Sequence, residues 1–189
     1  MKPNRLLIIG GSAGSLQVIL RVVTAIGENF PVPVLIVLHR NVGFESMLEG
    51  LFSSRTSLSI KEVEEKDPLL AGTVYLCPAD YHVLLETDRS FSLDYSERVH
   101  FSRPSIDVTL RSAADVYGGG LMAVLLSGGN ADGVEGMQYV KDLGGVTVVQ
   151  DPLTAEVPYM PQQAVTRMLP DHILRMEAIP GFIRDWGYR

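Results

Sequence analysis

LLIIGGSAGS, residues 6–15, places a short run of aliphatic side chains directly before a glycine-rich turn. Apolar residues then recur at helical spacing, namely Leu16, Ile19, Leu20, Val23 and Ile26. A short β-branched run is typical of a strand that is buried on both faces, and the later pattern is that of an amphipathic helix. The stretch therefore predicts a strand, a tight turn and a helix.

The same alternation continues along the chain. Short aliphatic runs at 34–38, 123–126 and 146–149 predict further buried strands, and stripes at 44–51, 106–117 and 134–143 predict helices. Strands that alternate with helices form mainly parallel sheets through right-handed crossovers. The expected fold class is α/β, a doubly wound and mainly parallel sheet, and residues 1–189 are expected to form a single domain.

One region departs from this alternation. Three closely spaced strand patterns occur at 73–76, 83–86 and 91–94, and Thr87-Asp88-Arg89 is a turn candidate between the last two. This spacing is typical of an antiparallel hairpin, which we expect at one edge of the main sheet. The mixed-charge run at 61–67 is interpreted as a solvated loop.

Composition and charge exclude several classes of protein. The net charge is −6 and the acidic residues are spread along the chain, so the sequence predicts no basic face for nucleic acid. The apolar run at 6–9 is shorter than the core of a secretion signal, which needs about 7–15 residues. No stretch approaches the roughly 18 apolar residues of a transmembrane helix. We expect a cytoplasmic protein without direct membrane insertion.

Ser12 lies at the centre of Gly-x-Ser-x-Gly, residues 10–14, which matches the pattern of a nucleophile elbow. Small neighbours allow a sharp turn, and the amide of Ala13 at a helix N-terminus can face a developing oxyanion. A glycine-rich turn from strand to helix also binds phosphate, although neither a dinucleotide-binding pattern nor a P-loop is present. On this motif alone, a hydrolase, an anion-binding turn and a purely structural turn all stay open.

Two further polar residues follow predicted strands. His39 comes directly after the strand at 34–38, and Asp132 ends a glycine-rich loop after the strand at 123–126. Because ligands bind outside the carboxyl ends of strands in an open parallel sheet, we expect both residues at the same rim as Ser12. An aspartate in this place is also expected to cap the helix that follows it.

These residue types fit nucleophilic catalysis. A serine hydroxyl needs a base to accept its proton, and an imidazole base needs a carboxylate to set its tautomer. Ser12, His39 and Asp132 supply the three groups, and Gly128 and Gly129 leave backbone amides uncovered that suit an oxyanion. The chain order Ser, His, Asp differs from the order Ser, Asp, His of α/β-hydrolases, which disfavours that fold.

With these motifs in this order, the chain resembles the catalytic domain of the chemotaxis receptor protein-glutamate methylesterases, the CheB-type methylesterases. The resemblance runs from about Leu6 to Val165. The matching motifs are Gly10 to Gly14, His39, Arg103-Pro104-Ser105-Ile106-Asp107, Asp132-Gly133, Gln150-Asp151 and Met160-Pro161 with Ala164. Their order and spacing together are specific, and residues 1–189 would be one methylesterase-like catalytic domain.

The resemblance implies roles for five residues. Ser12 would be the nucleophile, His39 the general base and acid, and Asp132 the orienting carboxylate, with the amides of Ala13 and Gly129 as the oxyanion hole. The reaction would be hydrolysis of glutamyl γ-methyl esters through an acyl-enzyme, with related deamidation of glutamine and with no cofactor or metal. The partners would be a methylated chemoreceptor or another methylated protein and a separate receiver protein, because the family's receiver domain is missing here.

Several positions depart from the family pattern. Ala13 stands where the family commonly has threonine, Gly129 where it usually has methionine, and Ser102 where a histidine is frequent, with His100 two residues earlier. For His82 we favour a structural role over a pocket-lining one. The departures at Ala13 and Gly129 keep open a catalytically decayed interaction domain of the same fold. The Gly10–Gly14 turn keeps open a phosphate- or nucleotide-binding module.

Overall fold

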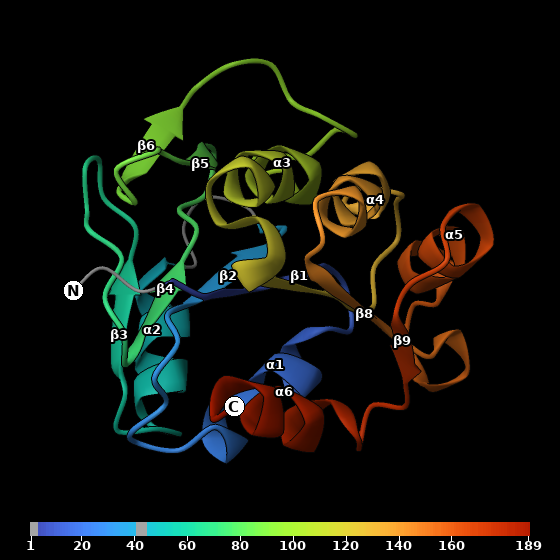
Figure 1. The fold of residues 1–189 in the computed structure, drawn as a ribbon, viewed down its shortest axis with the longest axis horizontal. Coiled ribbons are helices and arrows are strands. Elements are labelled where there is room, and N and C mark those ends of the chain that lie inside the picture. Colours follow the sequence, from blue (N-terminus) through green and yellow to red (C-terminus); the bar gives the residue numbers. More distant parts are fainter. Residues whose placement is uncertain (1–3, 41–44) are drawn as a thin grey trace.

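The computed structural model of the chain describes residues 4–40 and 45–189 and centres on a seven-stranded sheet (Figure 1). Its strand order is β3-β4-β2-β1-β7-β8-β9, and every neighbouring pair runs parallel. The strands are β1 (Leu6–Gly11), β2 (Val34–Leu38), β3 (Ser59–Glu62), β4 (Thr73–Leu76), β7 (Leu121–Leu125), β8 (Val146–Gln150) and β9 (His172–Leu174). The expected α/β class with a mainly parallel sheet is confirmed.

Helices cover both faces of this sheet (Figure 1). One face carries α1 (Leu16–Ala25), α2 (Glu45–Ser53) and α6 (Ile179–Gly187), and the other carries α3 (Ile106–Tyr117), α4 (Val134–Asp142) and α5 (Tyr159–Arg167). Side chains alternate between the two faces of a strand. In β1, Leu6 and Ile8 therefore enter the core under α3 and α4, whereas Leu7 and Ile9 enter the core over α1 and α6. All four are fully buried, which is why the run at the start of the chain is aliphatic without interruption.

The strand order reverses at β1, which lies between β2 and β7. From β1 the chain first builds the β2 side of the sheet, and it later returns to build the β7 side. The helix that follows β1 covers one face and the helix that follows β7 covers the other. Such a reversal opens a crevice at the carboxyl ends of the two strands. Ser12 and the loop from Ser127 to Asp132 begin there.

The antiparallel hairpin consists of β5 (His82–Leu85) and β6 (Phe91–Asp94), and it forms a two-stranded sheet of its own. It packs on α3, where Thr109 Oγ1 donates to the carbonyl of Val83 at 2.9 Å. β4 belongs to the parallel sheet instead and pairs with β2 and β3. The hairpin thus forms a separate layer, with β5 packed on α3 and Phe91 of β6 packed against Tyr75 of β4, their ring centroids 4.9 Å apart.

Two edge strands were not expected. The four-residue β3 and the charged run at 61–67 overlap at Lys61 and Glu62. The interpretation of this run as a loop is therefore wrong for these two residues. An edge strand tolerates charged side chains because one of its sides faces solvent. The opposite edge is the three-residue β9. Two short 3₁₀ helices, Gly118–Gly120 and Pro152–Thr154, complete the elements. No helix within residues 4–40 and 45–189 has the length and apolarity needed to cross a bilayer.

Candidate active site

Ser12 directly follows β1 in a turn that backbone and side-chain hydrogen bonds hold closed. Its amide donates to the carbonyl of Ser127 at 2.9 Å, and its carbonyl accepts from the Ser15 amide at 3.1 Å and from Ser15 Oγ at 2.7 Å. Among the described residues, the left-handed conformation in this turn falls on Gly14, at φ +78°, and not on Ser12. A side chain at Gly14 would also lie 2.6 Å from Cβ of Glu156. The turn therefore needs glycine at position 14, while Ser12 is unstrained and partly exposed.

His39 lies beside Ser12 because β2 pairs with β1 in parallel register. The amide of His39 donates to the carbonyl of Gly11 at 3.2 Å, which extends the ladder one step beyond the strands. The imidazole Nε2 of His39 lies 2.7 Å from Oδ2 of Asp132, a residue 93 positions later in the chain. The His39 side chain is 10% exposed and that of Asp132 is fully buried. The structure thus brings together the predicted base and the predicted carboxylate.

The carboxylate of Asp132 is fixed by the N-terminus of α3. Oδ1 accepts from Ser105 Oγ at 2.7 Å and from the Asp107 amide at 3.1 Å, and Oδ2 accepts from the Ile106 amide at 2.6 Å. The sequence predicts that Asp132 caps the helix that follows it. That expectation is wrong, because the N-cap of α4 is Gly133 and the Asp132 side chain crosses to a different helix. A negative charge at a helix N-terminus is stabilised by the free amides and the helix dipole.

These contacts keep the Asp132 carboxylate ionised. Burial acts to raise the pKa of Asp132, but the hydrogen bond and charge of His39, together with the donors at the start of α3, outweigh it and lower the pKa below its usual value. Asp107 shows the opposite balance. Its burial, with the nearby Asp132 charge adding to it, raises the pKa of Asp107 to about 6. The two neighbouring acids therefore ionise in different pH ranges.

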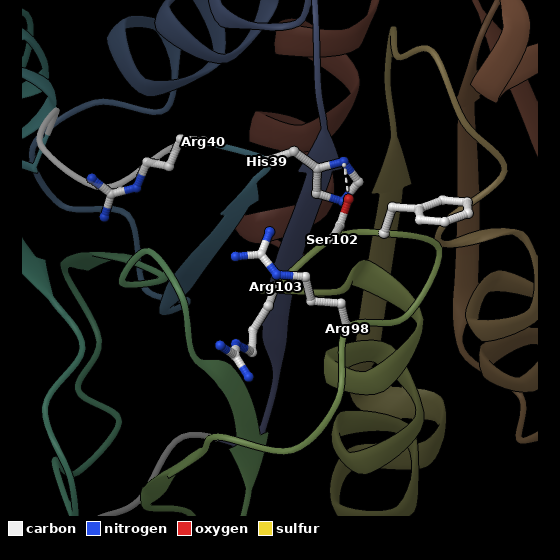
Figure 2. Close-up of a pocket in the computed structure, with 6 residues that line it drawn as sticks. His39, Arg40, Arg98, Ser102 and Arg103 are labelled. Atoms are coloured by element: carbon white, nitrogen blue, oxygen red, sulfur yellow. Dashed lines mark hydrogen bonds between the residues drawn. The ribbon is translucent and has the colours of Figure 1, made fainter.

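The second nitrogen of His39 faces a different serine from the one predicted. Nδ1 lies 3.3 Å from Ser102 Oγ, as the dashed line in Figure 2 marks. Because Nε2 faces a carboxylate, it carries the proton in the neutral ring and Nδ1 is the acceptor. Within the described part of the chain, no hydrogen bond joins Ser12 Oγ to the imidazole. Ser12 is adjacent to His39 in the sheet, but Ser102 is the hydroxyl in contact with it.

The two amides expected to form the oxyanion hole are both available. In the residues that the structure describes, neither the amide of Ala13 nor that of Gly129 donates a hydrogen bond, and both residues are exposed. The amide of Gly128 is not available, since it donates to the carbonyl of Val157 at 3.0 Å. Of the two glycines expected to leave amides uncovered, only Gly129 does so.

Gly128 has a steric role instead. A Cβ at this position would lie 2.6 Å from Cε of Met160 and 3.1 Å from Cβ of Ser12. At Gly129 the nearest atom to such a Cβ is Cγ1 of Val157, 4.0 Å away. Gly128 thus lets the loop pass close to Ser12 and to the end of the Met160 side chain, whereas Gly129 borders open space.

Ser127 and Gln150 position the site, although the sequence pattern did not identify either as a functional candidate. Ser127 Oγ donates to the carbonyl of Ala13 at 2.7 Å and accepts from the Val157 amide at 2.9 Å. The Ser127 amide in turn donates to Oε1 of Gln150 at 3.0 Å. Their positions at strand ends were the only signal in the sequence. Together they tie the Ser12 turn to the loop after β8.

His82 has the structural role that we favoured. Its ring is fully buried, Nδ1 accepts from the Ser105 amide at 3.0 Å, and Nε2 donates to the carbonyl of Glu97 at 2.9 Å. Both ring nitrogens are thus used to hold the segment that leads into α3. No group of His, Cys, Asp and Glu side chains in the described ranges could hold a metal ion.

Comparison of the chain with known proteins shows its family. A family model described as CheB methylesterase matches residues 7–183, nearly the whole chain. The chain belongs to the CheB methylesterase family. A family member from Leptospira interrogans is 39% identical over 173 residues, which cover 92% of this chain and 90% of the relative. The Thermotoga maritima protein-glutamate methylesterase/protein-glutamine glutaminase is 32% identical over 180 residues, 94% of this chain but 52% of that protein.

A solved structure of the CheB methylesterase family shares the fold. The crystal structure of the Thermotoga maritima CheB methylesterase catalytic domain superimposes with a TM-score of 0.92 at 31% sequence identity, covering 96% of this chain and 98% of that domain. The chain therefore corresponds to a catalytic domain, and it spans about half the length of relatives such as the Thermotoga maritima protein.

Proposed function

We propose that this chain is a carboxylic ester hydrolase that cleaves glutamyl γ-methyl esters on a protein, with residues 1–189 as its catalytic domain. The observation that carries the proposal is the 2.7 Å contact between His39 Nε2 and Asp132 Oδ2, formed beside the end of β1, which Ser12 directly follows. A buried carboxylate that fixes an imidazole beside a serine is the arrangement that activates a hydroxyl. The names of the family members support methyl esters as the substrate class.

The first half of the reaction forms an acyl-enzyme. Ser12 Oγ attacks the ester carbonyl carbon while its proton passes to Nδ1 of His39, the nitrogen that does not face Asp132. This step requires the Ser12 hydroxyl to replace Ser102 Oγ at Nδ1, and the 3.3 Å contact to Ser102 is long enough to be given up cheaply. The amides of Ala13 and Gly129 stabilise the oxyanion. The C–O bond to the methoxy group then breaks, and methanol leaves with the proton from the imidazolium.

The second half of the reaction returns the free enzyme. Water gives a proton to His39 Nδ1 and adds to the acyl carbon, and Ser12 Oγ leaves with that proton, which releases a glutamate side chain. With a glutamine side chain the leaving group is ammonia, so the same steps produce deamidation. No metal or cofactor takes part in this route.

The partners in this proposal follow from the family. The substrate is a methylated chemoreceptor or another methylated protein in the cytoplasm. A separate receiver protein is the candidate regulator, on the resemblance to the family alone.

Methanol release from a synthetic peptide with one glutamyl γ-methyl ester tests the proposal. Ser12→Ala is expected to lower the rate by at least about a thousandfold. Ser54→Ala, an exposed serine at the end of α2, is the matched control and should keep the wild-type rate. Equal rates for Ser12→Ala and the wild type would overturn the role of Ser12.

A catalytically decayed interaction domain is the second candidate, and one observation favours it. The hydroxyl bound to His39 Nδ1 belongs to Ser102 and not to Ser12. A serine-directed fluorophosphonate separates the two candidates. Covalent labelling at Ser12, located by mass spectrometry, supports catalysis, whereas a folded wild-type protein without labelling supports the decayed domain.

A further inference from the structure

A cavity of about 180 Å³ opens beside His39, on the side of the ring that faces Ser102 (Figure 2). It is lined by His39, Arg40, Arg98, Phe101, Ser102 and Arg103. Three of these six side chains are guanidinium groups, although the chain as a whole carries a net charge of −6. A concentration of positive charge against the overall charge of the protein, next to the candidate base, requires an explanation.

Arg103 is committed to holding the loop in place. Its guanidinium stacks 3.7 Å from the centre of the Tyr95 ring, and its Nη1 donates to the carbonyl of Ser96 at 2.6 Å. Its Nε and Nη2 both donate to Oδ1 of Asp80, at 3.2 and 2.8 Å. All three nitrogens are thus used within the protein, so Arg103 braces one wall of the cavity.

Arg40 is buried, and its hydrogen bonds are incomplete. Its side chain is 6% exposed, and Nη2 donates to the Glu62 carboxylate and to the carbonyl of Cys77. Nη1 has no hydrogen-bond partner within the described residues. A buried guanidinium nitrogen without an acceptor is costly. Nη1 is enclosed, and Figure 2 shows the Arg40 guanidinium directed away from Arg98 and Ser102, so Arg40 adds positive charge behind the cavity wall without contacting an anion in the cavity.

Arg98 has the most donors to spare. Its side chain is 58% exposed, and Nη2 donates to Oδ1 of Asp80 at 2.9 Å. Nε and Nη1 make no hydrogen bond in the part of the chain that the structure describes. Figure 2 shows the Arg98 side chain extending from its loop toward the middle of the cavity.

The charges at this place do not cancel. Three guanidinium groups are paired with two carboxylates, Glu62 and Asp80. The hydrogen bonds from Arg103 lower the pKa of Asp80, so this carboxylate stays ionised and counts as one negative charge. Arg98 and Arg103 thus share one close carboxylate, and the more distant Asp94 acts on Arg103. The donors that Arg98 has to spare suit a single monoanion. A carboxylate fits best because its two oxygens match the paired N–H groups of a guanidinium.

We infer that the cavity is a carboxylate subsite in which Arg98, with Arg40 behind it, binds an acidic side chain that neighbours the glutamyl ester in the substrate. The inference rests on the proposed function, because it takes the reacting ester to lie between Ser12 and His39. An ester there places the adjacent residues of the substrate over the cavity, since His39 itself forms part of the cavity wall. The subsite selects esters that have an acidic neighbour over those that have a neutral one.

Matched synthetic peptides test this selectivity. Each carries one glutamyl γ-methyl ester, flanked by glutamate in one peptide and by glutamine in the other. For the wild type, kcat/KM is expected to be about tenfold higher for the glutamate peptide, the size of one charge-assisted hydrogen-bonded contact. Arg98→Gln should reduce this ratio to about one. Arg111→Gln, an exposed arginine on α3 paired with Glu135, is the control and should keep the ratio.

Binding separates a failure of the subsite from a failure of the proposed function. Fluorescence anisotropy with Ser12→Ala and labelled versions of both peptides gives the ratio of Kd values without turnover. If no peptide is hydrolysed by the wild type, the proposed function fails, and the Kd ratio with and without Arg98→Gln still decides the subsite. The inferred subsite would be overturned if the ratio of Kd values for the two peptides is near one in the Ser12→Ala protein. It would also be overturned if adding Arg98→Gln leaves that Kd ratio unchanged.

A further comparison identifies the source of the carboxylate. The hydrolysed peptide, with glutamine neighbours, carries only the product carboxylate and is used as an inhibitor. If Arg98→Gln weakens its inhibition about tenfold and leaves the preference for glutamate neighbours intact, the cavity holds the product and the inference is overturned. If Arg98→Gln leaves inhibition by this peptide unchanged but abolishes the preference for glutamate neighbours, the cavity binds the neighbouring acidic side chain, as inferred.

Discussion

Asp132 connects the imidazole of His39 to the first turn of α3, accepting from His39 Nε2 at 2.7 Å and from the Ile106 amide at 2.6 Å through the same oxygen, Oδ2. The position of the base is therefore set by a helix that lies on the far side of the carboxylate. Asp132 therefore has two functions. It sets the tautomer of His39, and it stabilises the N-terminus of α3.

Asp132→Asn should damage both functions. An amide in place of the carboxylate cannot hold the Nε2–H tautomer, so kcat is expected to fall by roughly 10³- to 10⁴-fold. The loss of the negative charge at the start of α3 should lower the free energy of unfolding by about 1–2 kcal/mol. Ester turnover and urea unfolding measure the two effects. Asp115→Asn, on the exposed side of α3, is the control, and a kcat within tenfold of wild type for Asp132→Asn would contradict the assigned role.

The adjacent glycines should respond differently to alanine. Gly128→Ala places a methyl group 2.6 Å from Cε of Met160 and 3.1 Å from Cβ of Ser12, so something must move. We expect a loss of about 1–3 kcal/mol in the free energy of unfolding and reduced turnover. Gly129→Ala meets nothing nearer than 4.0 Å and keeps its amide, so it should behave almost as wild type. Equal effects of the two substitutions would exclude the close approach at Gly128.

Ser102→Ala should free Nδ1 of His39. The Ser102 hydroxyl lies 3.3 Å from Nδ1 and competes with the Ser12 hydroxyl for this nitrogen. Removal of the Ser102 hydroxyl is therefore expected to leave the rate of fluorophosphonate labelling at Ser12 unchanged or to raise it several-fold. The second-order rate constant of labelling, compared with Ser54→Ala, measures this. A fall of more than tenfold would mean that Ser102 takes part in activating Ser12 and does not merely occupy the base.

Asp107 should make stability fall as pH rises. Burial raises the pKa of Asp107 to about 6, whereas an aspartate in the unfolded chain has a pKa of about 3.9. Between about pH 4 and 6 the folded protein retains a proton that the unfolded chain has released, so the stabilising contribution of the neutral acid is present below pH 4 and is lost by pH 6. The group adjoins His100 and Asp132, and the pKa of Asp132 is lowered, which places its own titration below this window.

Asp107→Asn isolates this contribution. The difference in unfolding free energy between wild type and Asp107→Asn is expected to decrease by about 2–3 kcal/mol from pH 4 to pH 6. Urea unfolding at half-unit steps of pH measures it. A difference that is constant over this range, or that increases with pH, would contradict a raised pKa for Asp107.

Much of the fold could be predicted because the parallel strands are buried on both faces. Uninterrupted aliphatic runs such as Leu6 to Ile9 predict such strands at once, and α1 and α3 follow from stripes of period 3.6. The edge strands β3 and β9 could not be predicted this way. Their side chains are half exposed, so their composition does not differ from that of a loop.

The sequence by itself determined that a serine, a histidine and an aspartate each follow a buried strand, because strand, turn and helix patterns are local. Which groups meet is a matter of long-range packing, and only the tertiary structure decided it. It placed Asp132 at the N-terminus of α3 rather than of α4, put Ser102 against His39 Nδ1, and gathered Arg40 and Arg98 into one cavity. These contacts join residues 26 or more positions apart, and no local pattern encodes which helix dipole or which loop will satisfy a buried charge.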